Sequence, residues 1–96
     1  MRNGTKFDYR SVVEEPEVSA EIQNYGKSVY RFDDAYAALV GHLASGRGIK
    51  GSVRTIDNVT YYMYAQKANK MAKTPRLSVI YKVTDTQVII CRLFVD

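Results

Sequence analysis

The C-terminal stretch restricts the fold of this chain more than any other part of the sequence. Its two arms, Leu77–Val83 and Gln87–Val95, are rich in β-branched and aromatic residues, contain no Gly or Pro, and are joined by the polar segment Thr84–Thr86. This pattern predicts an antiparallel β-hairpin. Because the second arm is almost continuously apolar, we expect it to lie inside a sheet with both of its faces covered.

The rest of the chain predicts one strand, two helices and further strands. A chain of 96 residues is long enough for one modest core. Apolar periodicity and capping residues predict a strand at 6–13, a helix from Pro16 to Gly26, and a second helix that is capped by Asp33 or Asp34 and ends at Ser45-Gly46. Two further strands are predicted at 53–56 and 59–66, joined by a tight turn at Asp57-Asn58. We therefore predict a single α+β domain over residues 1–96. It has an N-terminal strand, two helices and a three- to four-stranded antiparallel sheet ending in a hairpin.

Alternation along residues 59–66 divides the side chains of that strand between two faces. Tyr62 and Tyr64 share one face, and Tyr61 lies on the other. The two helices each carry one apolar stripe, so they are expected to cover one face of the sheet. We expect Tyr62 and Tyr64 to gather with basic residues on the face that the helices leave bare.

The positive charge of the chain is concentrated in its middle. The net charge is +4, but residues 47–76 carry seven basic side chains and one acidic side chain, a net +6, while residues 1–46 sum to −2 and residues 77–96 to zero. Segregated basic charge in a small domain is typical of a polyanion partner. The alternative is a solvated loop that keeps the protein in solution.

Several classes of protein do not fit this sequence. No apolar run is long enough to span a membrane, and no hydrophobic block follows the N-terminus as in a signal peptide, so we expect a cytoplasmic protein without a membrane partner. The chain has no phosphate-binding glycine loop, no nucleophile elbow and no Cys or His pair at metal-ligand spacing, which predicts neither a metal nor a cofactor. The single cysteine, Cys91, is expected to be a small buried hydrophobe.

RNA is the polyanion that the tyrosines near the basic segment favour. Lysine and arginine neutralise phosphates, and aromatic faces stack on unpaired bases. RNA also allows cleavage without a metal, in which the 2′-hydroxyl attacks its own phosphate, a base takes its proton, cations stabilise the phosphorane, and an acid protonates the leaving oxygen. Such a site needs few specialised residues.

The order of elements and the final hairpin resemble the RelE/ParE superfamily of bacterial toxins. The resemblance rests on the opening strand, the two helices, the segment Ile49–Gly51, the strand ending near Tyr64, and above all Val79–Asp85 followed by Val88–Ile90. It implies a small α+β domain that, in RelE-like members, cuts messenger RNA without a metal, and in ParE-like members inhibits DNA gyrase. The sequence departs from the family at Ser78, where RelE-like proteins usually have Arg, and in the long basic segment Lys67–Arg76.

The favoured hypothesis is therefore a small RelE-like toxin that binds and cleaves RNA. In it, Arg54 and Arg76 stabilise charge, Tyr64 or Tyr62 stacks or transfers a proton, and His42 is a remote acid or base. The phosphate-binding residues would be Arg47, Lys50, Lys67, Lys70 and Lys73, with Tyr62 as the stacking ring. For His42, a structural role at the edge of an apolar stripe is the alternative reading.

The expected partners are RNA, free or on the ribosome, and a cognate antitoxin or immunity protein. Two other hypotheses stay open. One is a non-catalytic phage or plasmid factor that binds nucleic acid or inhibits a host protein, and the other is a ParE-like gyrase inhibitor.

Overall fold

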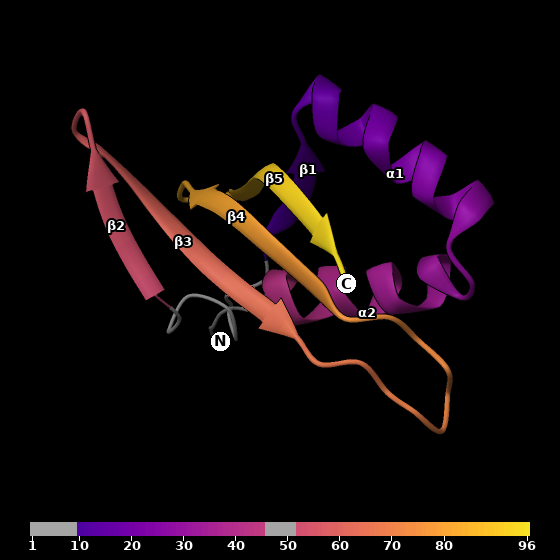
Figure 1. The fold of residues 1–96 in the computed structure, drawn as a ribbon. Helices are drawn as coiled ribbons and strands as arrows, with labels where there is room; N and C mark the ends of the chain where they lie inside the picture. Colours follow the sequence, from indigo (N-terminus) through magenta and orange to yellow (C-terminus); the bar gives the residue numbers. More distant parts are fainter. Residues whose placement is uncertain (1–9, 46–51) are drawn as a thin grey trace, which may run out of the picture.

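The computed structural model describes residues 10–45 and 52–96. One strand is followed by two helices and then by four strands (Figure 1). The elements are β1 (Ser11–Glu14), α1 (Pro16–Ser28), α2 (Phe32–Ala44), β2 (Ser52–Ile56), β3 (Val59–Gln66), β4 (Leu77–Val83) and β5 (Gln87–Val95). This order confirms the predicted α+β fold. Residues 6–9 of the predicted first strand lie outside the described residues.

β4 and β5 form the predicted hairpin. In its turn, the backbone N–H of Thr84 donates to the carbonyl of Gln87 at 2.8 Å, and the Thr84 hydroxyl accepts the N–H of Gln87 at 3.0 Å. β5 lies between β4 and β1 and is therefore inside the sheet, as predicted. The expectation that both faces of β5 are covered is wrong, because Arg92 and Phe94 on one face are exposed.

The five strands form one sheet in the order β1-β5-β4-β3-β2. The pairs β2–β3, β3–β4 and β4–β5 are antiparallel, and β1 pairs in parallel with β5 at one edge. The β2–β3 turn uses Asp57 and Asn58 with φ of 50° and 66°. Positive φ at both central residues gives the turn whose twist suits a two-residue hairpin, which is the turn predicted at this dipeptide.

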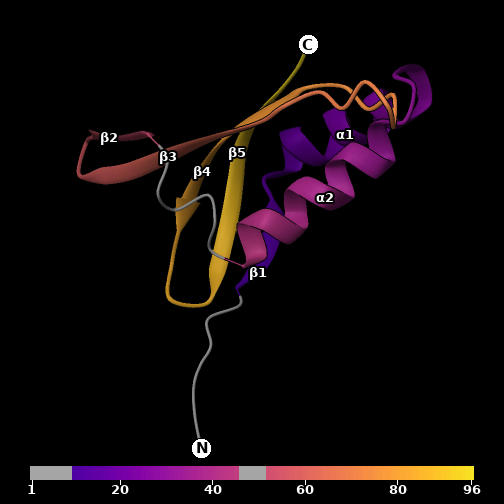
Figure 2. The ribbon, with the colours of Figure 1, turned by 90° about the horizontal axis from the view of Figure 1, so that it is seen from below.

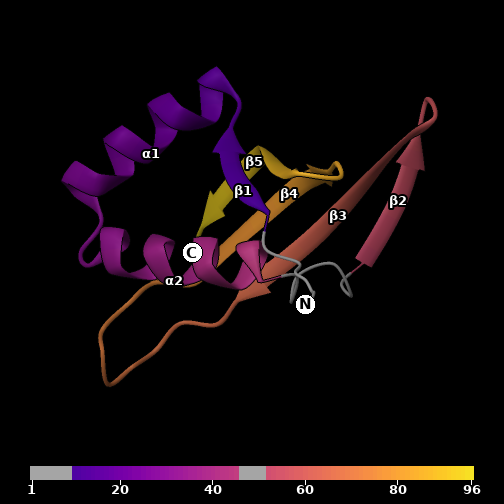
Figure 3. The same cartoon turned by 180° about the vertical axis from the view of Figure 1, so that it is seen from behind.

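Both helices lie on the same side of the sheet (Figures 2 and 3). Each buries one stripe of side chains against β4 and β5, whose alternate residues point toward the helices. The buried core consists of Val18, Phe32, Ala35, Leu39, Leu43, Leu77, Val79, Tyr81, Val88, Ile90 and Leu93. The opposite side of the sheet, which we call the open face, has no helix over it in the described part of the chain (Figure 1).

Tyr62 and Tyr64 share a strand face, as predicted, but it is the face toward the helices. Both rings pack against the core, and Tyr62 stacks on Tyr81 with ring centroids 5.6 Å apart. Gln66 on the same face donates from its Nε2 to the carbonyl of Ala35 in α2 at 2.8 Å. The prediction that these tyrosines lie on the bare face is wrong, because both side chains pack against the core between the sheet and the helices.

The helix ends differ from the predicted ones. α1 begins at Pro16 as expected, but it continues through Gly26 to Ser28. α2 is preceded by Arg31 in the left-handed conformation, with φ of 57°. Asp34 lies within the first turn and pairs with the Arg31 guanidinium at 2.6 Å, so neither aspartate caps the helix.

Candidate nucleic-acid interface

A hollow of about 850 Å³ lies on the open face, between the β2–β3 hairpin and the start of α1. Basic side chains reach it from three different strands, namely Arg54 from β2, Lys82 from β4 and Arg92 from β5. Its other lining residues are Glu15, Glu17, Val53, Ile56, Tyr61, Tyr62, Met63, Ile80 and Cys91. The hollow therefore combines three cations, two carboxylates, apolar surface and the side chains of two tyrosines.

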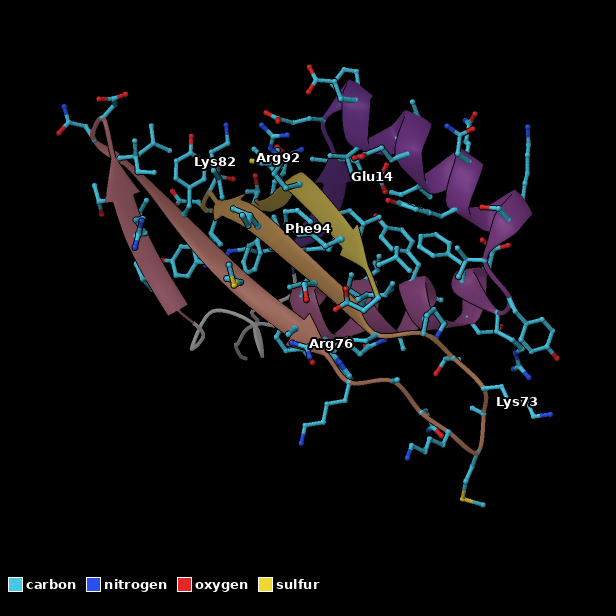
Figure 4. The ribbon with its side chains drawn as sticks, viewed as in Figure 1. Glu14, Lys73, Arg76, Lys82, Arg92 and Phe94 are labelled. Carbon is cyan, nitrogen blue, oxygen red and sulfur yellow. The ribbon has the colours of Figure 1, made fainter. Side chains whose placement is uncertain are left out.

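The strand register explains why these residues meet. Arg54 lies opposite Tyr61 across β2 and β3, and Met63 lies opposite Ile80, which in turn lies opposite Arg92. Neighbouring strands are about 5 Å apart, so adjacent side chains of these rows are within reach of one ligand. Figure 4 shows Lys82 and Arg92 near each other at this end of the sheet.

A β-bulge in β5 brings Arg92 to this face. The pairing shifts between Ile80 and Tyr81, so that Ile80 faces Arg92 while Tyr81 faces Ile90. Cys91 is the extra residue, and both Cys91 and Arg92 line the hollow. A bulge inserts one residue and re-aims its neighbours, which keeps Ile90 and the residue after Arg92 in the core.

Glu15 adds a carboxylate to the hollow. It lies just before α1, and its Oε2 is 3.8 Å from the Lys82 ammonium, with both side chains about one third exposed, 39% and 33%. Within residues 10–45 and 52–96, no three His, Cys, Asp or Glu side chains converge as metal ligands would.

Cys91 is half-buried and stays protonated at neutral pH. Burial raises the pKa of its thiol, and the neighbouring Glu15 carboxylate raises it further, outweighing the effects of Lys82 and Arg92. A nucleophilic cysteine needs the opposite shift. Cys91 therefore contributes a small apolar surface to the hollow, close to the role predicted for it.

The predicted catalytic residues do not meet at one place. Arg54 lines the hollow, whereas Arg76 lies at the other end of β4, where its Nε is 3.7 Å from Asp96 (Figure 4). His42 and Tyr64 contact each other on the helix side of the sheet, with 2.9 Å between the His42 Nδ1 and the Tyr64 hydroxyl. These four side chains cannot act together on one phosphate in this arrangement.

The predicted phosphate-binding residues are also divided. Lys67, Lys70 and Lys73 are exposed on the connection between β3 and β4, with Lys73 far from the hollow (Figure 4). Arg47 and Lys50 lie outside the described residues. Tyr62 borders the hollow, although its ring stacks on the core residue Tyr81.

The sequence did not point to Lys82, Arg92 or Glu15, and Tyr61, one of three neighbouring tyrosines considered for stacking, was not among the predicted site residues. Alternation along β4 could have identified Lys82, because Val79 and Tyr81 are buried and Lys82 has the opposite parity. Tyr61 was assigned to the face expected to lie under the helices. Alternation could not have identified Arg92, because the bulge breaks the alternation of side chains between the two faces of β5 from Ile90 to Leu93.

Comparisons with known proteins add no relative to this picture. No family model matches the sequence, and neither curated proteins nor solved structures give a significant match. The RelE/ParE resemblance therefore stays a prediction. No helix in the described part of the chain has the length and apolar character needed to cross a membrane.

Proposed function

We propose that this protein binds single-stranded RNA in the hollow on the open face and cleaves it without a metal, as a small RelE-like toxin would. The observation that carries the proposal is the convergence of Arg54, Lys82 and Arg92, from three strands, beside the ring of Tyr61. An RNA target places this activity in the cytoplasm, and a toxin would be paired with an antitoxin that covers the same face.

The composition of the hollow suits a nucleotide. Its three cations neutralise phosphates, and Tyr61 offers a half-buried ring next to the partly exposed Met63, on which a base can stack. A stacked base contributes roughly 1–3 kcal/mol. Unpaired bases are needed for this contact, so the geometry favours single strands over a duplex.

The same residues support cleavage of the RNA backbone. The Glu15 carboxylate would take the proton of the 2′-hydroxyl as its oxygen bonds to phosphorus, and the Tyr61 hydroxyl would give a proton to the departing 5′-oxygen. The products are a 2′,3′-cyclic phosphate and a free 5′-hydroxyl. Lys82, Arg54 and Arg92 would stabilise the charge that develops on the phosphorane, which is the main electrostatic contribution in such sites.

One observation favours a binding protein without catalysis. The only histidine of the chain, His42, lies on the helix side and contacts Tyr64. Carboxylate and tyrosine are weaker acid–base partners for RNA at neutral pH than a histidine would be. In this second reading, the same hollow binds RNA and leaves it intact.

Binding is tested with a fluorescent single-stranded RNA titrated at several salt concentrations. Replacing Lys82 and Arg92 together by alanine should weaken binding. It should also make the fall of the logarithm of the association constant with log salt less steep by about 1.4, since each phosphate contact to a single strand contributes about 0.7 to that slope. Lys27→Ala on α1, which is exposed on the helix side, is the matched control and should change neither value. Equal losses for both variants would contradict the proposed site.

Cleavage is tested with end-labelled RNA in excess EDTA. Wild-type protein should produce fragments ending in a cyclic phosphate, and Glu15→Gln should slow their formation by about 100-fold or more while binding stays within a few fold. Unchanged RNA with intact, salt-dependent binding would select the non-catalytic reading instead.

A further inference from the structure

The connection between β3 and β4 projects beyond the end of the sheet, at the opposite end of β3 from the β2–β3 turn (Figure 1). We call residues 67–76 the basic finger. It carries Lys67, Lys70, Lys73 and Arg76, and it contains no acidic residue. The hollow described above lies elsewhere, since none of these residues lines it.

Hydrogen bonds define the backbone conformation at the tip of the basic finger. Asn69 and Thr74 form an antiparallel bridge, in which each backbone N–H donates to the other residue's carbonyl, at 3.2 Å and 3.1 Å. The Asn69 side chain also accepts the N–H of Ala72 at 2.9 Å. These bonds close the four residues 70–73 into a turn, so the backbone at the tip has a defined path.

The tip side chains do little for the fold. Met71 is 95% exposed, the largest exposure among the described large hydrophobic residues. Lys73 adopts φ of 60°, a left-handed conformation that Gly or Asn takes more readily. In the described chain, no carboxylate forms an ion pair with Lys67, Lys70 or Lys73. An apolar wedge between unpaired cations therefore points into solvent.

This chemistry fits the grooves of a nucleic-acid duplex. Lysines bind the phosphates that border a groove. Apolar side chains such as Met insert between base steps in proteins that bind the minor groove of DNA, and Met71 would make the analogous contact on the wide, shallow minor groove of an RNA duplex. A membrane surface fits less well, because a single apolar side chain gives too little buried surface for stable anchoring. An acidic protein surface could pair with the lysines, but its charges would give the exposed Met71 side chain no apolar surface to contact.

The distance between the basic finger and the hollow suits one continuous RNA. From Arg76 to Lys82 the chain runs six residues along β4, about 20 Å at 3.3 Å per residue. About six stacked nucleotides at 3.4 Å each span that length. A single strand lying in the hollow would thus reach the base of the finger at Arg76 after about six nucleotides, and a duplex joined to it there would lie along the finger toward the tip.

We propose that the basic finger holds a double-stranded RNA segment next to the single strand bound in the hollow, with Lys70 and Lys73 on phosphates and Met71 as the wedge. The inference rests on the proposed function for the hollow. It specifies the substrate class as RNA with a junction between a single strand and a duplex.

The test compares three fluorescent RNAs: a single strand of about eight nucleotides, longer than the gap of about six, a stem carrying that strand as an overhang, and the blunt stem. Wild-type protein should bind the overhang RNA about tenfold more tightly than the single strand. Lys70→Ala combined with Lys73→Ala should remove this advantage and leave single-strand binding unchanged. Met71→Ser should remove part of it. Lys27→Ala is the control, and urea unfolding confirms that each variant is folded.

The outcomes separate the finger from the hollow. The finger inference is overturned if wild-type protein binds the single strand and the overhang RNA equally, or if the finger variants weaken binding of both by the same factor. In either case binding of RNA in the hollow stands. Binding of both stems that needs the finger lysines but not Lys82 and Arg92 would contradict the proposed function and the junction substrate, and would show that the finger binds a duplex without the hollow. Capture by anionic vesicles that depends on Met71, without an advantage for the overhang RNA, would overturn the inference.

Discussion

Glu14 connects both helices to the edge of the sheet. Its two carboxylate oxygens accept hydrogen bonds from the Tyr36 hydroxyl of α2 at 2.7 Å and from the Ser19 hydroxyl of α1 at 3.1 Å. Tyr36 is half-buried, and its ring stacks on Phe32. One carboxylate therefore holds three elements in register.

Tyr36→Phe should lower the free energy of unfolding by about 1–2 kcal/mol, because it removes a hydrogen bond to a charged group and leaves the ring in place. Urea unfolding measures the change. Tyr30→Phe is the control, since Tyr30 is 70% exposed, and it should have no effect. A loss below a few tenths of a kcal/mol for Tyr36→Phe would show that the bond contributes little.

The raised pKa of Tyr81 leads us to expect that the protein becomes less stable at alkaline pH. Burial raises the pKa of Tyr81 to about 12, with smaller contributions from Tyr62 and Tyr64. In the unfolded chain a tyrosine loses its proton near pH 10, so between about pH 10 and 12 the unfolded state binds fewer protons than the folded one. The free energy of unfolding should then fall by roughly 1.4 kcal/mol per pH unit for this group.

Unfolding by urea at pH values from 8 to above 11 measures this effect. Tyr81→Phe should have a shallower decline above pH 10, whatever its stability at pH 8. Tyr36 should add to the decline in both proteins, because burial and Glu14 raise its pKa even further. A Tyr81→Phe curve parallel to the wild-type curve would contradict the assignment.

Alternation predicted which residues of β3 share a face, but it could not predict which face meets the helices. Both sets contain apolar and aromatic side chains, so the pattern of residues 59–66 is nearly symmetric. The choice depends on how the rings of Tyr62 and Tyr64 fit against α2 and Tyr81, which is a tertiary property.

At the scale of elements, local signals worked best where the backbone itself is restricted. Pro16 marked the start of α1, and Asp57-Asn58 marked the β2–β3 turn. The predicted end of α1 at Gly26 was wrong, because a helix tolerates an internal glycine when packing of its other residues stabilises it. The bulge at Cys91 has no signature in the sequence, and it decides where Arg92 points.

The β2–β3 turn offers a prediction about this hairpin. Asn58 has φ of 66°, so Asn58→Gly should keep or slightly raise the stability, whereas Asn58→Ile should lower it by about 1–2 kcal/mol through left-handed strain. Thermal or urea unfolding measures both changes. Because the turn fixes the pairing of Arg54 with Tyr61, Asn58→Ile should also weaken RNA binding. Equal stability of the two variants would contradict the assigned turn.

At the scale of the whole molecule, the important feature is the division of the sheet into two faces. The helices bury one face, and the other carries cations and exposed apolar residues such as Met63 and Phe94, at 46% and 49% exposure. The sequence predicted a bare face and a basic segment. It also predicted a basic connection over Lys67–Arg76, which carries four of the seven basic residues of 47–76. It did not predict that Lys82 and Arg92 of the final hairpin would supply cations to the open face.

The central claim is that RNA lies on the open face, and photo-crosslinking tests it most directly. A single-stranded RNA carrying 4-thiouridine is bound, irradiated and digested, and the crosslinked peptides are identified by mass spectrometry. We predict crosslinks on the open face, at Tyr61, Met63 or Cys91, which line the hollow. Crosslinks confined to the helix side, such as at Tyr25 in α1 or at Tyr30 between the two helices, would contradict the account.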